Sequence, residues 1–167
     1  MSEVSDRRLS LKREAQKYDD FEEFSRDYSW NLMRGRYWHV TSDPNFKLKK
    51  EYAPCDASSL AAGPGGTCGL MVSYTPEVWA AYFPKREYAA EIDLSGACKG
   101  VDYMIVDRGF GHEIFVSNID KVKVVSVVPL EEAVRESDRY NESIPQSEEA
   151  LRKFFEEARK GQKERRC

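Results

Sequence analysis

The acidic residue with the most distinctive surroundings is Glu113, which follows the stretch Gly109-Phe110-Gly111-His112. Its two glycines permit positive φ and weaken any regular element just before the acid. Beyond Glu113, Ile114 and Val116 alternate with Phe115 and Ser117, which predicts a strand. Glu113 therefore stands at the mouth of a predicted strand. A carboxylate there can serve chemistry, or it can be an ordinary exposed acid at the end of an element.

A second strand pattern follows this one. Residues 118–121 are a polar break, and a β-branched run resumes from Val122 to Val128. Two apolar runs separated by a short polar segment are typical of a β-hairpin. The sequence thus predicts a hairpin that begins at Glu113.

Length, composition and charge define the class of protein. The 167 residues suggest one domain, and 33% charged residues indicate a well-solvated globular surface. The net charge of −3 gives no general attraction to nucleic acid or anionic membranes. No apolar run approaches a membrane span and the N-terminus has no hydrophobic signal core, so we expect a cytoplasmic protein with no membrane partner.

The cysteines show no Cys-x-x-Cys pair and no histidine cluster, which disfavours a metal site. We therefore expect no metal and reduced thiols at Cys55, Cys68, Cys98 and Cys167.

Both ends of the chain predict amphipathic helices. Apolar residues recur at steps of three and four from Leu11 to Leu32, which predicts one helix that covers a sheet, with a partner-binding role left open. Near the other end, Ser147 caps a helix that Gly161 terminates. The basic tail after it is expected to be solvated, with nucleic-acid contact as the alternative.

The middle of the chain predicts mainly strands and one short helix. Thr75 is a predicted N-cap and Pro76 suits the first helical position. Residues 43–68 show little periodicity and predict a long loop, which would suit a lid. The predicted strands are residues 36–42, 69–74, 87–94 (with one solvated face) and 101–106; the helix is 75–83, and 130–134 is a short helix or turn.

Three motifs occur in order: His39-Val40-Thr41 on the first strand, Gly69 to Tyr82 across a strand and helix, and Glu113 before a late strand. Together they resemble the ADP-ribosyltransferase fold, closest to its diphtheria-toxin and poly(ADP-ribose)-polymerase branch. The resemblance covers about residues 36–130. It implies a single α+β domain with split antiparallel sheets and flanking helices, made of an N-terminal helix (1–34), a catalytic core (35–130) and a C-terminal helix with a basic tail (131–167).

The resemblance implies an NAD-dependent ADP-ribosyltransferase, a glycosyltransferase that cleaves the nicotinamide–ribose bond and passes ADP-ribose to a macromolecular acceptor. Glu113 would stabilise the oxocarbenium-like ribose. His39 would contact the adenosine-side ribose. The backbone of Val40 would pair with the nicotinamide carboxamide, beside Thr41, because an amide needs one donor and one acceptor.

The sequence departs from the family in two places. Val40 stands where the family usually has Gly, and the aromatic expected eleven residues before Tyr82 is Met71, unless Tyr74 takes that place. Either residue could pack against the nicotinamide opposite Tyr82, with Trp79 as a second aromatic on that face.

The predicted acceptor loop comprises Phe110, Gly111 and His112. Gly111 stands where arginine-modifying members commonly carry Gln or Glu, which disfavours an arginine acceptor. The acceptor, protein or nucleic acid, stays open, as does the oligomeric state.

Two other functions also remain open: an NAD glycohydrolase, and a catalytically silent NAD- or ADP-ribose-binding module, which Val40 and Met71 favour. RNA 2′-phosphotransfer is disfavoured because the chain has only two histidines.

Overall fold

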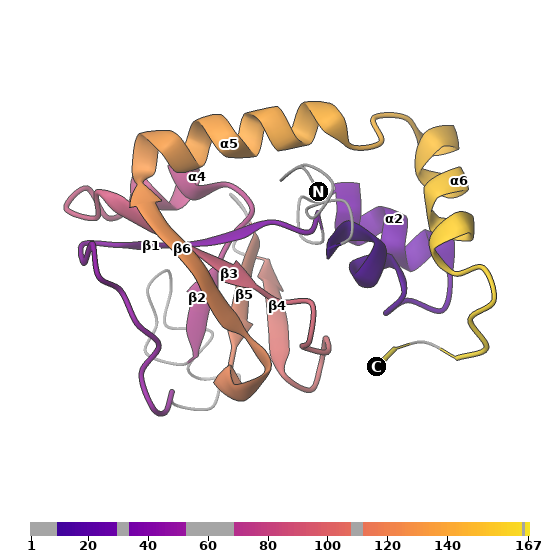
Figure 1. Ribbon diagram of the computed structural model, residues 1–167, viewed down its shortest axis with the longest axis horizontal. Coiled ribbons are helices and arrows are strands. Elements are labelled where there is room, and N and C mark those ends of the chain that lie inside the picture. Colours follow the sequence, from indigo (N-terminus) through magenta and orange to yellow (C-terminus); the bar gives the residue numbers. More distant parts are fainter. Residues whose placement is uncertain (1–9, 30–33, 53–68, 108–111, 165) are drawn as a thin grey trace.

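The fold belongs to the α+β class, with two antiparallel three-stranded sheets and helices around them (Figure 1). This computed structural model describes residues 10–29, 34–52, 69–107, 112–164 and 166–167. Phe110, Gly111 and residues 53–68 of the predicted lid lie outside the described residues. The expectation of an α+β fold is confirmed at this level.

The two sheets meet at one β-bridge. The backbone N–H and C=O of Trp38 exchange hydrogen bonds with those of Ser73, both at 2.8 Å. The first sheet runs β1 (Tyr37–Thr41), β3 (Tyr88–Asp93), β6 (Lys123–Pro129), and the second runs β2 (Leu70–Val72), β5 (His112–Val116), β4 (Tyr103–Asp107). Continuing through the bridge, β2 lies next to β1.

The predicted hairpin is wrong, although both of its strands exist. β5 lies between β2 and β4, whereas β6 pairs with β3 in the other sheet. The 3-10 turn η1 (Ile119–Lys121) begins the connection between the two sheets. β5 is buried along most of its length and needs a partner on each side. Alternation within a strand says nothing about which strand lies beside it.

The prediction of a single N-terminal helix is also wrong, because this segment contains two helices. Residues 10–15 are helical, residues 16–17 turn, and α2 spans Phe21–Ser29. The side chain of Asp20 caps α2 by accepting a 2.8 Å hydrogen bond from the N–H of Glu23. The predicted apolar stripe still packs in the main core, since both pieces turn it inward.

Among the described residues, three further helices follow: α4 (Pro76–Ala80), α5 (Leu130–Ser143) and α6 (Glu148–Ala158). α5 is much longer than the predicted short helix. Its buried stripe of Ala133, Ser137 and Tyr140 has helical spacing but too little apolar character to be recognised. α6 is as predicted, and Ser147 accepts its capping hydrogen bond from Ala150 at 3.2 Å.

β3 has no solvated face, in contrast to the prediction. Glu91, on the face expected to be wet, is 2% exposed and pairs with the guanidinium of Arg36 at 3.0 Å. Arg36 also bonds to Glu136 of α5 and lies over the ring of Trp38 at 4.8 Å. An ion pair thus fills the space under α5 and holds β1 to β3.

The expected reduced thiols are wrong for Cys98 and Cys167, which form a disulfide. Cys55 and Cys68 lie outside the described residues. In the described part of the chain, no helix is both long enough and apolar enough to cross a membrane.

Candidate functional site

The candidate site lies where β1 and β2 separate. Trp38 directs its backbone groups to β2, so those of Val40, two residues on, face the same side. Among the described residues, β2 makes no backbone hydrogen bond to Val40. The edge of β1 at Val40 therefore offers one donor and one acceptor.

His39 stands in the middle of β1, and its ring bridges the separation. Nδ1 lies 2.7 Å from the backbone oxygen of Met71, and the ring packs on Phe46 with centroids 4.8 Å apart. A carbonyl oxygen only accepts, so Nδ1 carries the proton. In the neutral ring Nε2 is then a hydrogen-bond acceptor.

Burial lowers the pKa of His39 from 6.5 to about 4. The hydrogen bond to Met71 opposes this, and the charges of Arg86 and Lys49 lower the pKa further. His39 is therefore neutral at physiological pH.

Glu113 is the second residue of β5 and is 0% exposed, so the alternative of an ordinary exposed acid is wrong. It pairs with Val106 of β4. Continuing the β2 register by one residue brings Ser73 opposite Glu113, and Ser73 is itself bridged to Trp38. The buried carboxylate of Glu113 thus lies two strands from β1. It is level with the bridge between Trp38 and Ser73, beyond which β1 and β2 separate.

His39 and Glu113 occupy neighbouring rows of the sheets, since Glu113 is level with Trp38. Neighbouring rows present side chains to opposite faces wherever the strands stay in register. By register, the structure therefore does not bring the side chains of His39 and Glu113 together on one face.

Val40, Met71 and Trp79 pack together with Phe115 in one apolar cluster. Val40 as a whole residue is 1% exposed, so its backbone N–H and C=O are covered as well as its side chain. Trp79 is equally buried and is a core residue in this structure.

Tyr82 lies beyond the end of α4 and is 49% exposed, with its ring 6.1 Å from that of Trp79. Tyr74 is 7% exposed, and its ring lies 5.0 Å from the guanidinium of Arg34. Tyr82 is thus the more accessible candidate for stacking. Thr41 is buried and accepts a 3.1 Å hydrogen bond from the N–H of Asp43.

His112 begins β5 and pairs with Asp107 of β4, with Nε2 and Oδ2 3.9 Å apart. It is the one residue of the predicted acceptor loop that the structure describes. The described residues contain no cluster of three potential metal ligands.

Two cations near His39 were missed by the sequence analysis. They are Lys49 and Arg86. Arg86 is half-buried, with its guanidinium 4.0 Å from the centre of the Phe83 ring, and burial lowers its pKa. Neither cation forms an ion pair with a described residue. The basic content of residues 47–50 was visible in the sequence, but only the fold brings it to His39.

Comparison with family models, curated proteins and solved structures found no match.

Proposed function

We propose that this protein is an NAD-dependent ADP-ribosyltransferase. The observation that carries the proposal is the fully buried carboxylate of Glu113, level with the point where β1 and β2 separate. Two antiparallel sheets that meet at one bridge are compatible with the split-sheet ADP-ribosyltransferase fold.

NAD would lie along the edge of β1 at Val40, which is buried in this structure. The N–H and C=O of Val40 suit the nicotinamide carboxamide, which has one donor and one acceptor side. The fixed tautomer of His39 leaves Nε2 to accept from a ribose hydroxyl. Lys49 and Arg86 supply positive charge beside His39 for the diphosphate.

Glu113 would act on the reacting ribose. As nicotinamide leaves, positive charge develops on that ribose, and a carboxylate at its 2′-hydroxyl stabilises the charge. The interaction is stronger in a buried site than in water, because the surroundings screen it less. Tyr82 would stack on the nicotinamide ring from the exposed side.

The silent-module alternative, which Val40 and Met71 favour, stays open. The side chain of Val40 packs in the apolar cluster. A backbone edge that needs no side chain can be offered by valine as well as by glycine.

The test is incubation of the purified protein with NAD carrying a label on the adenylate, alone and with cell lysate. We expect free nicotinamide in both and label on macromolecules with lysate. Release without transfer would identify a glycohydrolase. Glu113→Gln should slow release about 10²–10³-fold, whereas Glu142→Gln, at an exposed position of α5, should leave it unchanged. No release from the wild type would contradict the proposal.

A further inference from the structure

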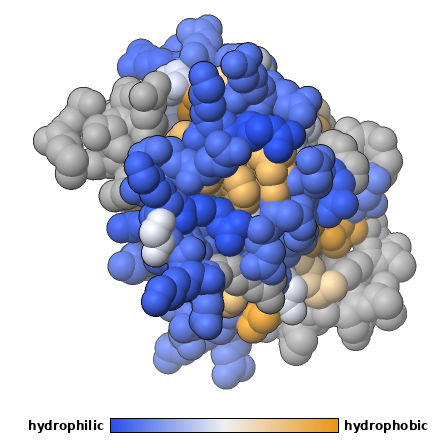
Figure 2. All heavy atoms as spheres, turned by 90° about the vertical axis from the view of Figure 1, so that its right-hand side faces the viewer, coloured by the Kyte–Doolittle hydropathy of each residue, from blue (hydrophilic) through white to orange (hydrophobic). Residues whose placement is uncertain are grey.

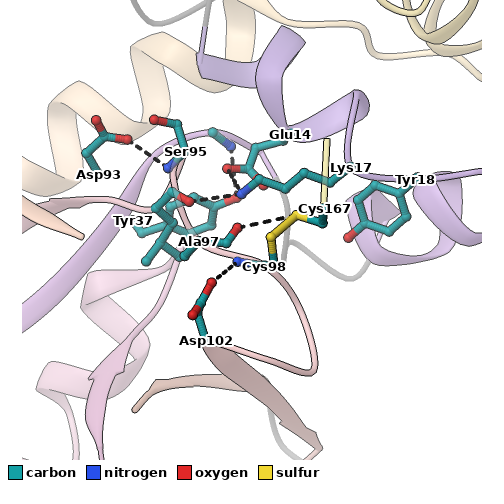
Figure 3. Close-up of polar contacts among 12 residues, drawn as sticks. Glu14, Lys17, Tyr18, Tyr37, Asp93, Ser95, Ala97, Cys98, Asp102 and Cys167 are labelled. Carbon is teal, nitrogen blue, oxygen red and sulfur yellow. Dashed lines mark hydrogen bonds and ion pairs between the residues drawn. A yellow bond between two sulfur atoms is a disulfide. The ribbon is translucent and has the colours of Figure 1, made fainter. Parts of the chain in front are cut away.

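The disulfide between Cys98 and Cys167 joins two distant parts of the fold. Cys98 lies in the connection between β3 and β4, Cys167 is the last residue, and 69 positions separate them (Figure 3). The bond therefore fixes the end of the tail after α6 to the edge of the sheets.

Three hydrogen bonds of this tail reach the turn between the first two helices. Gln162 donates to the backbone oxygen of Gln16 at 2.9 Å, and the N–H of Arg166 donates to the same oxygen at 3.0 Å. Arg159 donates to the backbone oxygen of Asp19 at 2.5 Å. The tail is thus held in place, while most of its described residues are exposed, in line with the expected solvated segment.

This end of the molecule offers the tail little apolar burial. The face that carries α6 is largely hydrophilic, with a small hydrophobic area near its centre (Figure 2). Gln162 is half-buried, but Lys160, Lys163 and Arg166 are exposed. The polar contacts can each be replaced by water, so the covalent bond is the strongest attachment of the tail.

A buried charged pair lies next to the disulfide. Nζ of Lys17 lies 3.0 Å from Oε1 of Glu14 and donates to the backbone oxygen of Leu94 at 2.9 Å. A cavity of about 100 Å³ has both Lys17 and the two disulfide cysteines in its wall. Figure 3 shows the disulfide close to this pair.

We propose that the Cys98–Cys167 disulfide is a reversible latch: a dithiol reductant opens it, frees residues 159–167 from the turn at 16–19, and admits water to the Lys17–Glu14 pair. The latch is independent of the function proposed above.

The exchange begins at Cys167, which is exposed. A thiolate of the reductant attacks its sulfur, the Sγ–Sγ bond breaks, and the electron pair leaves on Sγ of Cys98. The second thiol of the reductant then displaces the Cys167 thiolate. The reductant becomes a disulfide, and two electrons and two protons pass to the two cysteines.

The test is limited trypsin digestion of the full-length protein with and without dithiothreitol, with the products identified by mass spectrometry. On reduction, the Cys98–Cys167 disulfide should add two hydrogens to the mass of the intact chain. Cleavage after Lys160 and Lys163 should then accelerate roughly tenfold or more. Cys98→Ser should be cleaved fast without reductant. The Cys55→Ser/Cys68→Ser double variant should respond like the wild type.

Two outcomes overturn the latch. One is oxidised protein whose mass and peptide map contain no Cys98–Cys167 link. The other is wild-type protein that gains the two hydrogens while its tail is cleaved at an unchanged rate. The second comparison needs no variant, so a failure of Cys98→Ser to fold does not weaken it.

Discussion

The lowered pKa of His39 predicts a specific loss of stability in acid. In the unfolded chain His39 binds a proton near its ordinary pKa of 6.5, whereas in the folded protein it does so only near 4. Between these pH values the unfolded state holds more protons. The contribution of His39 is therefore fully present above pH 6.5 and is lost progressively as pH falls towards 4.

The magnitude follows from the same two values. They differ by about 2.5, and each pH unit corresponds to about 1.4 kcal/mol, so His39 contributes at most about 3.5 kcal/mol to this loss. His39→Gln is the matched variant, because its amide can still donate to the backbone oxygen of Met71 but does not titrate.

The assay is urea unfolding of both proteins between pH 4 and 8. The wild type should lose more stability than His39→Gln, with the gap opening below pH 6.5. Proton NMR should follow His39 directly, since the chain has one other histidine, His112. Parallel stability curves from pH 7 to 4, or titration of His39 near 6.5, would refute the buried neutral imidazole and the tautomer derived from it.

Three other predictions concern binding and stability. Arg86→Met should raise the KM for NAD about tenfold or more with kcat unchanged, because a charge-assisted hydrogen bond contributes about 1.5–3 kcal/mol. Lys85→Met, at an exposed neighbouring position, should change the KM little. Equal KM values for the two variants would argue against a phosphate contact at Arg86. Tyr82→Ala should weaken NAD binding by about 1–3 kcal/mol in calorimetry, the range for one base–aromatic stack, and an unchanged Kd would remove Tyr82 from the site. Cys98→Ser should lower the free energy of unfolding by about 4 kcal/mol, the loop-closure entropy of about 70 residues, and its urea midpoint should match that of reduced wild type; a midpoint equal to that of the oxidised protein would show that the bond contributes no stability.

Local patterns predicted most strands and the last helix, because burial imposes their periods directly. They could not predict which strands pair. β5 and β6 carry similar apolar runs on either side of a polar turn, yet they belong to different sheets. The break between residues 15 and 21 was hidden for a related reason: the apolar stripe continues through it, while Lys17 points inward to Leu94.

The site at Glu113 and His39 stays a prediction, since both residues were chosen because their motifs resemble those of ADP-ribosyltransferases. The structure adds what the sequence cannot give: the burial of Glu113, the tautomer of His39 and the absence of a β2 partner for Val40 among the described residues. Ser73 had no signal of its own, because its place level with Glu113 depends on two strand registers.

The most direct test of the proposed activity is nicotinamide release at saturating NAD by the wild type, His39→Ala and Glu113→Gln. In the proposed site, a contact of His39 with the adenosine ribose would be equal in the ground and transition states, so its loss should raise KM and leave turnover largely intact. A contact of Glu113 with the reacting ribose would strengthen with the developing charge, so its loss should reduce turnover about 10²–10³-fold while NAD still binds. Equal turnover in Glu113→Gln and wild type would contradict the account.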